Sequence, residues 1–169
     1  MRNGSRPLAA DVLLGAAAGA AATWVMDRVT TAMYEREAEE ARRREDKARG
    51  GKTAYVIAAE KAAAAAGITL GEGDEKKLGS AIHWALGIGA GAAYGLLRNR
   101  IPRLGIGSGI AYGIAFWLLM DEAGLTLLGL TPPPREFPWQ AHARGAAGHV
   151  VLGAVTEAVF DASDFAQRA

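Results

Sequence analysis

The stretch VLLGAAAGAAATWVM, residues 12–26, has no charged side chain and lies between Asp11 and Asp27. With Leu8–Ala10 ahead of it, this stretch reaches the roughly 20 weakly polar residues that a helix needs to cross a bilayer. Three later stretches are similarly apolar, at residues 80–97, 106–120 and 145–160, although the last carries Glu157. The sequence therefore predicts an all-α integral membrane protein, with four transmembrane helices at about residues 8–27, 79–98, 105–123 and 142–160.

A soluble helical bundle is the main alternative for these four segments. Because none of the segments has a polar side, a small soluble domain built from them would leave no face for water. A cleaved signal peptide is an alternative for the first segment alone, since Arg2 and Arg6 precede it. The acidic Asp11 and the scarcity of leucine beyond Leu14 argue against this alternative. We therefore expect the first segment to be a membrane span.

Composition limits the classes of function. Nineteen basic residues balance 18 acidic ones, and the formal net charge of +1 gives no argument for a nucleic-acid partner. The chain has no cysteine, which excludes disulfides, thiolate metal sites and cysteine nucleophiles. No motif pairs a nucleophile with a base, so we do not expect an enzyme. The length of 169 residues fits one membrane domain, 1–169.

A charged segment at about residues 28–78 separates the first two spans. Within it, glutamates precede arginines by four residues, which is the favourable order on an exposed helix. These pairs are Glu39–Arg43, Glu40–Arg44 and Glu45–Arg49. We therefore predict an extramembrane helical arm, solvated and stopped by Gly50 and Gly51. Thr53 is the predicted N-cap of a second helix that runs to Ala66 and ends at Gly67.

Glycines recur every four residues in three places. In lipid, small residues let two helix backbones approach closely, so these glycines predict tight packing between helices of the chain. Association of several copies into a homo-oligomer through the same faces is the alternative. The glycines are Gly15 and Gly19, then Gly87, Gly91 and Gly95, and finally Gly105, Gly109 and Gly113.

Two passages share their spacing, which indicates an internal duplication. The first is Gly15-x3-Gly19-x6-Met26-Asp27, and the second is Gly109-x3-Gly113-x6-Met120-Asp121. The second and fourth spans share a shorter pattern, His83-x2-Leu86-Gly87 and His149-x2-Leu152-Gly153. These patterns predict two similar helical hairpins in parallel orientation, with the charged arm inserted in the first. Chance matching between stretches rich in alanine and glycine is the alternative.

The duplication brings ionisable residues towards one side of the membrane. An aspartate ends each rising helix, and a histidine begins each returning one. His142 and His149, seven residues apart, lie within about 20° of the same helix face. The predicted polar cluster consists of Asp27, His83, Asp121, Glu122, His142, His149 and Glu157.

Ionisable groups inside spans usually face the bundle interior and pair with one another, so this cluster has several interpretations. Its ion pairs could hold the helices together, or the cluster could sense protons, because a histidine beside a carboxylate titrates near neutral pH. We predict no cofactor, although Asp and His ligands leave a metal or haem open. Glu157 lies deeper, where it could continue a polar path, or pair with Arg144 or a lipid headgroup.

The chain resembles the YagU-type family of small bacterial inner-membrane proteins. The resemblance rests on the glycine-rich first span ending in Met26-Asp27, on the pattern His83-x3-Gly87-x3-Gly91-x2-Tyr94-Gly95, and on the helix with His149-x3-Gly153. The third span followed by Asp121-Glu122, and the Leu128-Gly129-Leu130 loop with its prolines, carry it further. The resemblance implies a multi-pass protein of the bacterial inner membrane, without established biochemical activity and linked in one lineage to acid tolerance.

The leading hypothesis is therefore a non-enzymatic protein of the lipid bilayer that responds to protons through its Asp/His cluster. A scaffold or accessory subunit of a larger membrane complex is the second hypothesis, and a haem- or metal-binding membrane protein is the third.

Overall fold

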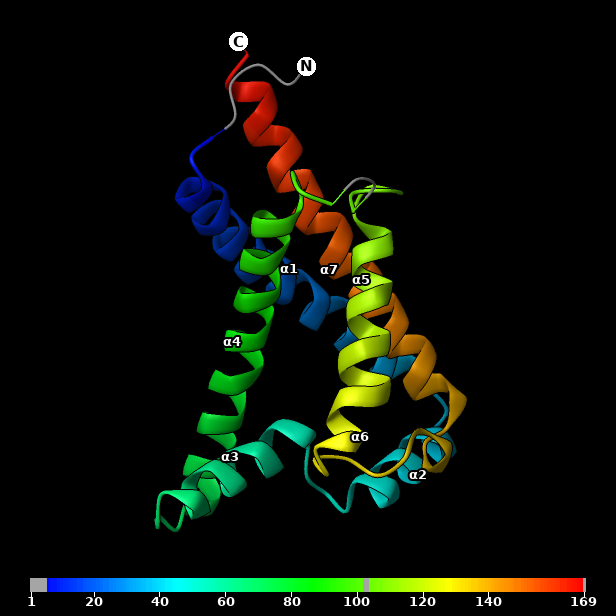
Figure 1. Ribbon diagram of the computed structural model, residues 1–169. Helices are drawn as coiled ribbons and strands as arrows, with labels where there is room; N and C mark the ends of the chain where they lie inside the picture. Colours follow the sequence, from blue (N-terminus) through cyan, green and yellow to red (C-terminus); the bar gives the residue numbers. More distant parts are fainter. Residues whose placement is uncertain (1–5, 102–103, 169) are drawn as a thin grey trace.

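The computed structural model describes residues 6–101 and 104–168, and within them the chain is helical, with no β-strand (Figure 1). Arg2, considered above as part of a signal peptide, lies outside the described residues. The elements are α1 (Leu8–Arg36), α2 (Glu39–Arg49), α3 (Ala54–Ala65), α4 (Glu72–Leu97), α5 (Ile110–Trp117), the π-helical segment η1 (Leu118–Gly124), α6 (Leu125–Leu127), the 3-10 turn η2 (Pro134–Glu136) and α7 (Trp139–Ala166).

The long helices form one bundle. α1 packs against both α4 and α7, and α5 packs against α7. The start of α1 and the end of α7 lie at one end of this bundle, whereas α2, α3 and α6 lie at the other (Figure 1). α3 packs against α4 there. We refer to the end that carries α2, α3 and α6 as the arm end.

Three helical segments, rather than four, are long and apolar enough to cross a membrane: Leu8–Arg36, Gly73–Leu97 and Ile110–Leu127. The prediction of a fourth apolar span at residues 142–160 is therefore wrong, although α7 covers that range. The reason is that α7 carries Arg144, His149 and Glu157, all buried against the neighbouring helices. α7 is the polar inner helix of the bundle, and its charges are satisfied by the other elements.

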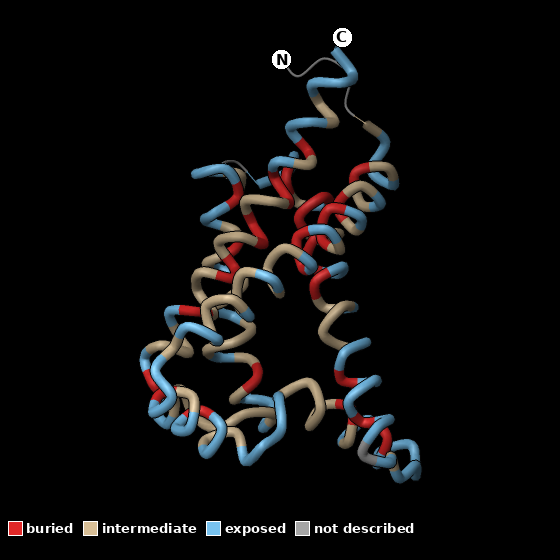
Figure 2. The backbone as a smooth tube through the Cα atoms, turned by 180° about the vertical axis from the view of Figure 1, so that it is seen from behind, coloured by how far each residue is buried: buried red, intermediate tan, exposed pale blue. Residues whose placement is uncertain are grey.

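Many large apolar side chains lie outside, and most of the buried residues are small or polar. The buried hydrophobic residues are mostly alanines, and they share the interior with charged groups such as Asp11 and Arg98. Leu13, Leu119 and Leu127 are 70%, 69% and 85% exposed. Figure 2 shows pale exposed segments along the outer sides of the long helices. This distribution is the reverse of that in a soluble domain, and it is the one expected of helices covered by lipid.

Glycines lie where the long helices cross. A Cβ atom at Gly91 of α4 would lie 2.5 Å from Gly19 Cα of α1, and one at Gly109 would lie 2.7 Å from the carbonyl carbon of Gly153. Side chains at these positions would push the helices apart. Gly105 and Gly109, however, precede α5, because positive φ angles at Gly107, Ser108 and Gly109 prevent regular helix there. The expectation that this span begins near residue 105 is therefore wrong.

The charged arm is solvated on one side, as the sequence predicted, but it does not continue the first span and its other side is buried. α1 ends at Arg36, and the separate helix α2 turns back onto α7, where Glu45 is 1% exposed. The Glu39–Arg43 and Glu45–Arg49 pairs form, with N–O distances of 2.6 and 2.5 Å. Glu40 pairs with Arg43 at 3.0 Å instead of with Arg44. Burial of the Glu45 carboxylate is unfavourable unless a cation pairs with it, and Arg144 of α7 provides that cation.

The predicted N-cap of α3 is confirmed, because the Thr53 hydroxyl accepts a hydrogen bond from Val56 N at 3.3 Å. Thr53→Ala should lower the free energy of unfolding by about 1 kcal/mol, since it leaves a donor of the first turn unpaired. Thr53→Ser keeps the hydroxyl and should differ from the wild type by only a few tenths of that value, roughly 0.3 kcal/mol. Chemical unfolding monitored by circular dichroism measures both. Equal losses in the two variants would contradict the cap.

Candidate functional site

Each of the three histidines faces a carboxylate on another element, and all three lie at the arm end. His83 of α4 faces Asp27 of α1, with Nε2 and Oδ1 2.9 Å apart. The other two histidines are on α7 and face η1. His142 Nδ1 lies 2.7 Å from Glu122 Oε1, and His149 Nδ1 lies 3.7 Å from Asp121 Oδ2. The structure therefore brings together six of the seven residues of the predicted cluster and pairs them across helices.

The two carboxylates that face α7 lie on a π-helical segment. Such segments insert an extra residue into a helix and occur often at functional sites. Asp121 and Glu122 are neighbours in η1, and each is directed to one of the two histidines that share a face of α7. The sequence contained the residues and their spacing, but it gave no signal for this π-helical backbone.

A cavity of about 230 Å³ opens beside these pairs. Its aromatic walls are Tyr55, Trp117 and Phe137, and its polar lining includes Asp121, Glu122 and His142. Tyr55 also contacts His83, with ring centroids 4.9 Å apart. Burial, followed by the negative charges of Asp121 and Asp27, raises the pKa of the Tyr55 phenol. The phenol therefore stays neutral and can donate a hydrogen bond into the cavity.

Arg144, which also lines the cavity, joins α7 to the arm. Its Nη2 donates to both carboxylate oxygens of Glu45 at 2.6 Å, and its Nη1 donates to Glu37. The guanidinium carbon lies 4.9 Å from the centroid of the Tyr34 ring. The alternative in which Arg144 pairs with Glu157 is therefore wrong. An arginine in an otherwise apolar stretch is the sequence signal for such a buried partner.

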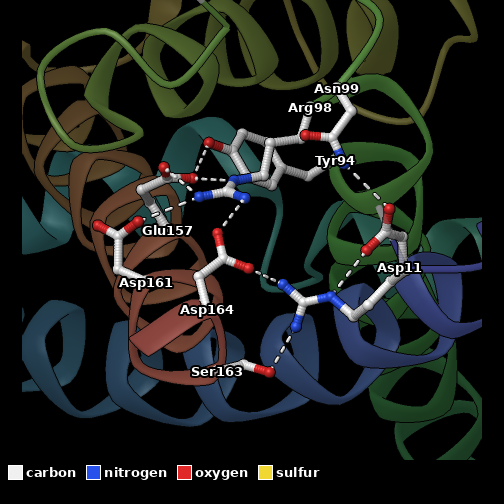
Figure 3. A network of polar contacts seen from close by, with 9 residues as sticks. Asp11, Tyr94, Arg98, Asn99, Glu157, Asp161, Ser163 and Asp164 are labelled. Carbon is white, nitrogen blue, oxygen red and sulfur yellow. Dashed lines mark hydrogen bonds and ion pairs between the residues drawn. The ribbon is translucent and has the colours of Figure 1, made fainter. Parts of the chain in front are cut away.

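Glu157 belongs to a separate network at the opposite end of the bundle (Figure 3). Arg98 Nε and Nη2 donate to its two oxygens at 2.9 Å, and the Tyr94 hydroxyl also donates to it. Arg98 further pairs with Asp161 and Asp164, both at 3.0 Å. Glu157 therefore does not continue a polar path from the histidines. It is a structural partner of Arg98, which the sequence analysis did not single out.

The two halves of the bundle repeat one set of contacts. Asp27 and His83 meet in the first half as Asp121 and His149 do in the second. Cβ atoms built at Gly19 and at Gly113, which correspond in the repeat, would also clash with the facing helix, 3.0 Å from Gly91 Cα and 2.8 Å from the His149 carbonyl carbon. The glycine contacts are displaced by one helical turn between the two halves, because a Cβ atom at Gly19 would be nearest to Gly87 O, whereas one at Gly113 would be nearest to His149 O rather than to Gly153 O.

The described residues offer no group of three or more His, Asp or Glu side chains placed to hold a metal ion. The histidines instead form separate pairs with carboxylates.

A family model described as "Protein of unknown function (DUF1440)" matches residues 55–158 of the chain. The match includes the three histidines, Asp121, Glu122 and most of α7, whereas Asp27 and the arm helix α2 precede it. No curated protein and no solved structure matches the chain.

Proposed function

We propose that this chain, which belongs to the DUF1440 family of proteins of unknown function, is an integral membrane protein whose arm end responds to protons. The match is compatible with the YagU-type resemblance, so we extend the proposal to the bacterial inner membrane. The three apolar segments and the outward-facing leucines support the membrane environment. α7 fits this environment because its buried Arg144 and Glu157 face Glu45 of α2 and Arg98 after α4 rather than lipid.

One observation carries the proton response: both ring nitrogens of His142 face hydrogen-bond acceptors. Nδ1 lies 2.7 Å from Glu122 Oε1, and Nε2 lies 3.0 Å from the carbonyl oxygen of Pro134. A carbonyl oxygen only accepts, so Nε2 must carry a hydrogen. An ionised carboxylate also only accepts, so Nδ1 needs a second hydrogen unless Glu122 itself is protonated. The pair therefore holds one proton more than a neutral histidine beside an ionised glutamate.

The extra proton allows His142 to make hydrogen bonds to two other elements at once. His142 connects α7 to η1 through Glu122 and to the proline-rich loop through Pro134. When the proton leaves, the neutral ring has a single N–H for two acceptors, and one of the two contacts is lost. His83 lies in a comparable pair with Asp27 nearby, and His149 lies 3.7 Å from Asp121. Changes of pH between about 5 and 8, where histidines exchange protons, should therefore loosen or tighten the arm end.

Nitrogen NMR of the protein with labelled histidine, in micelles, tests this proposal. The chain has three histidines, so single replacements by glutamine assign each signal. At pH 6 we expect both nitrogens of His142 to carry hydrogen in the wild type. Glu122→Gln removes the negative acceptor, and we expect it to leave one protonated nitrogen at pH 7. Glu39→Gln, at an exposed carboxylate of α2, is the control and should change nothing.

Two results would overturn the proposal. The first is a neutral His142 ring, with one bare nitrogen, in the wild type at pH 6 with Glu122 ionised. The second is tryptophan emission that stays constant from pH 5 to 8 in the wild type, because Trp117 lines the cavity and should report any loosening of the arm end.

A further inference from the structure

The cavity at the arm end has a chemical character that the proton response does not explain. Its volume of about 230 Å³ corresponds to about seven or eight water molecules, and it is smaller than a drug-sized site. Elements from both halves of the chain form its wall, from Thr30 of α1 to Gly145 of α7. Its lining includes both positive and negative side chains, so the ligand that it can bind depends on which of these side chains already have ion-pair or hydrogen-bond partners.

The positive side chains of the cavity already have partners. Arg144 binds the glutamates of the arm, as described above. Arg49 Nη2 lies 2.5 Å from Glu45 Oε1. His142 has acceptors at both nitrogens. An anionic ligand would have to compete with buried carboxylates for each of these cations, and breaking such pairs is costly.

Asp121 differs from every other charged group of the cavity. Within the described part of the chain, its one ion-pair partner is His149, at 3.7 Å, beyond hydrogen-bond distance. The same Nδ1 of His149 donates to Gly145 O at 2.9 Å, so its hydrogen is already used. The Asp121 side chain is 29% exposed and lines the cavity. This carboxylate therefore has room for a donor that the protein does not supply.

The walls next to Asp121 suit a cation with an apolar body. Tyr55, Trp117 and Phe137 contribute aromatic rings to the lining, and the faces of such rings attract ammonium ions through the ring quadrupole. Threonine hydroxyls from Thr53 and Thr126 can accept further N–H hydrogens. A carboxylate beside aromatic rings is a combination that binds an ammonium group more tightly than either element alone.

We infer that this cavity binds a primary organic ammonium ion, with Asp121 as its charge partner. Such a group has two sources near a membrane: a free amine, or the ethanolamine headgroup of a phospholipid. The inference does not depend on protonation of His142, so either can fail without the other.

Binding of 2-phenylethylammonium to the full chain in maltoside micelles tests the inference, with tryptophan emission as the signal. We expect the wild type to bind the amine and to show at least tenfold weaker binding of 3-phenylpropionate, the anion of matched shape. Asp121→Asn should weaken binding of the amine by about tenfold or more, because a charge-assisted hydrogen bond is lost. Glu39→Gln, on the exposed face of α2, should bind as the wild type does.

Ala141→Phe is the second variant, because it fills the cavity and leaves every charge in place. It should abolish binding, and it keeps the test informative if Asp121→Asn does not fold. Nanodiscs distinguish the sources: phosphatidylethanolamine should weaken binding of the added amine relative to phosphatidylglycerol if the headgroup occupies the site. Equal binding in both lipids assigns a free amine. Equal affinity for the matched anion, or undiminished binding by either variant, would overturn the inference.

Discussion

Replacing Gly91 by alanine should destabilise the protein by about 3 kcal/mol, the upper part of the range for overpacked interiors. A Cβ atom at this position would lie 2.5 Å from Gly19 Cα and 2.6 Å from Gly19 N. Those are backbone atoms of α1, which cannot rotate away as a side chain would. α1 and α4 must therefore separate along their contact.

Gly89 provides the matched control, two residues earlier on the same helix. A Cβ atom there has no atom within 4 Å. Gly89→Ala should therefore gain helix propensity and stabilise the protein by about 0.5–1 kcal/mol. Unfolding in mixed micelles, followed by circular dichroism, measures both variants. Wild-type stability of Gly91→Ala would contradict the α1–α4 contact. Destabilisation by Gly89→Ala would show that a second chain covers this face.

The second large effect is expected at Arg98, whose side chain is 4% exposed. Arg98→Met should lower the free energy of unfolding by about 3–5 kcal/mol, because it leaves Glu157 buried without its cation. The neighbouring Asp161 and Asp164 lose the same partner.

A double variant separates the loss of a charge partner from the loss of packing. Arg98→Met combined with Glu157→Leu removes both charges, and it should recover most of the stability, since well-packed apolar pairs often replace buried ion pairs at little cost. Arg43→Met serves as the exposed control, because its side chain is 61% exposed, and it should change stability by less than about 0.5 kcal/mol. If Arg98→Met matched Arg43→Met, the network of Figure 3 would contribute nothing to stability.

The sequence predicted the elements that depend on local composition. The apolar stretches correspond to α1, α4 and α5, and Thr53 was recognised as a cap because a cap needs only neighbouring residues. Prediction from the sequence failed where an element is stabilised by partners that lie far away along the chain. Glu45 looked solvated because Arg144, which makes its burial favourable, lies 99 residues later.

The candidate site shows the same division. Its histidines and carboxylates could be named, since their spacing repeats, and the structure places six of them at one end. Glu157 was misplaced because its partner Arg98 follows the apolar stretch of α4 and has no counterpart of like charge in the repeat. Neither the π-helical turn at Asp121 nor the second acceptor of His142 has a local signature. Both arise only when η1 and the proline-rich loop meet α7.

The long separation between charge partners also determines when the structure can be completed during synthesis. Glu45 can form its ion pair only after Arg144 has been synthesised, and Arg6 can pair with Asp164 only after residue 164 has been synthesised. The first half therefore leaves the ribosome with acidic and basic groups whose native partners do not yet exist. α7, which follows the other described helices in the chain, closes the bundle at both of its ends. A chain truncated before α7 should accordingly be a substrate for proteolysis rather than a smaller folded unit.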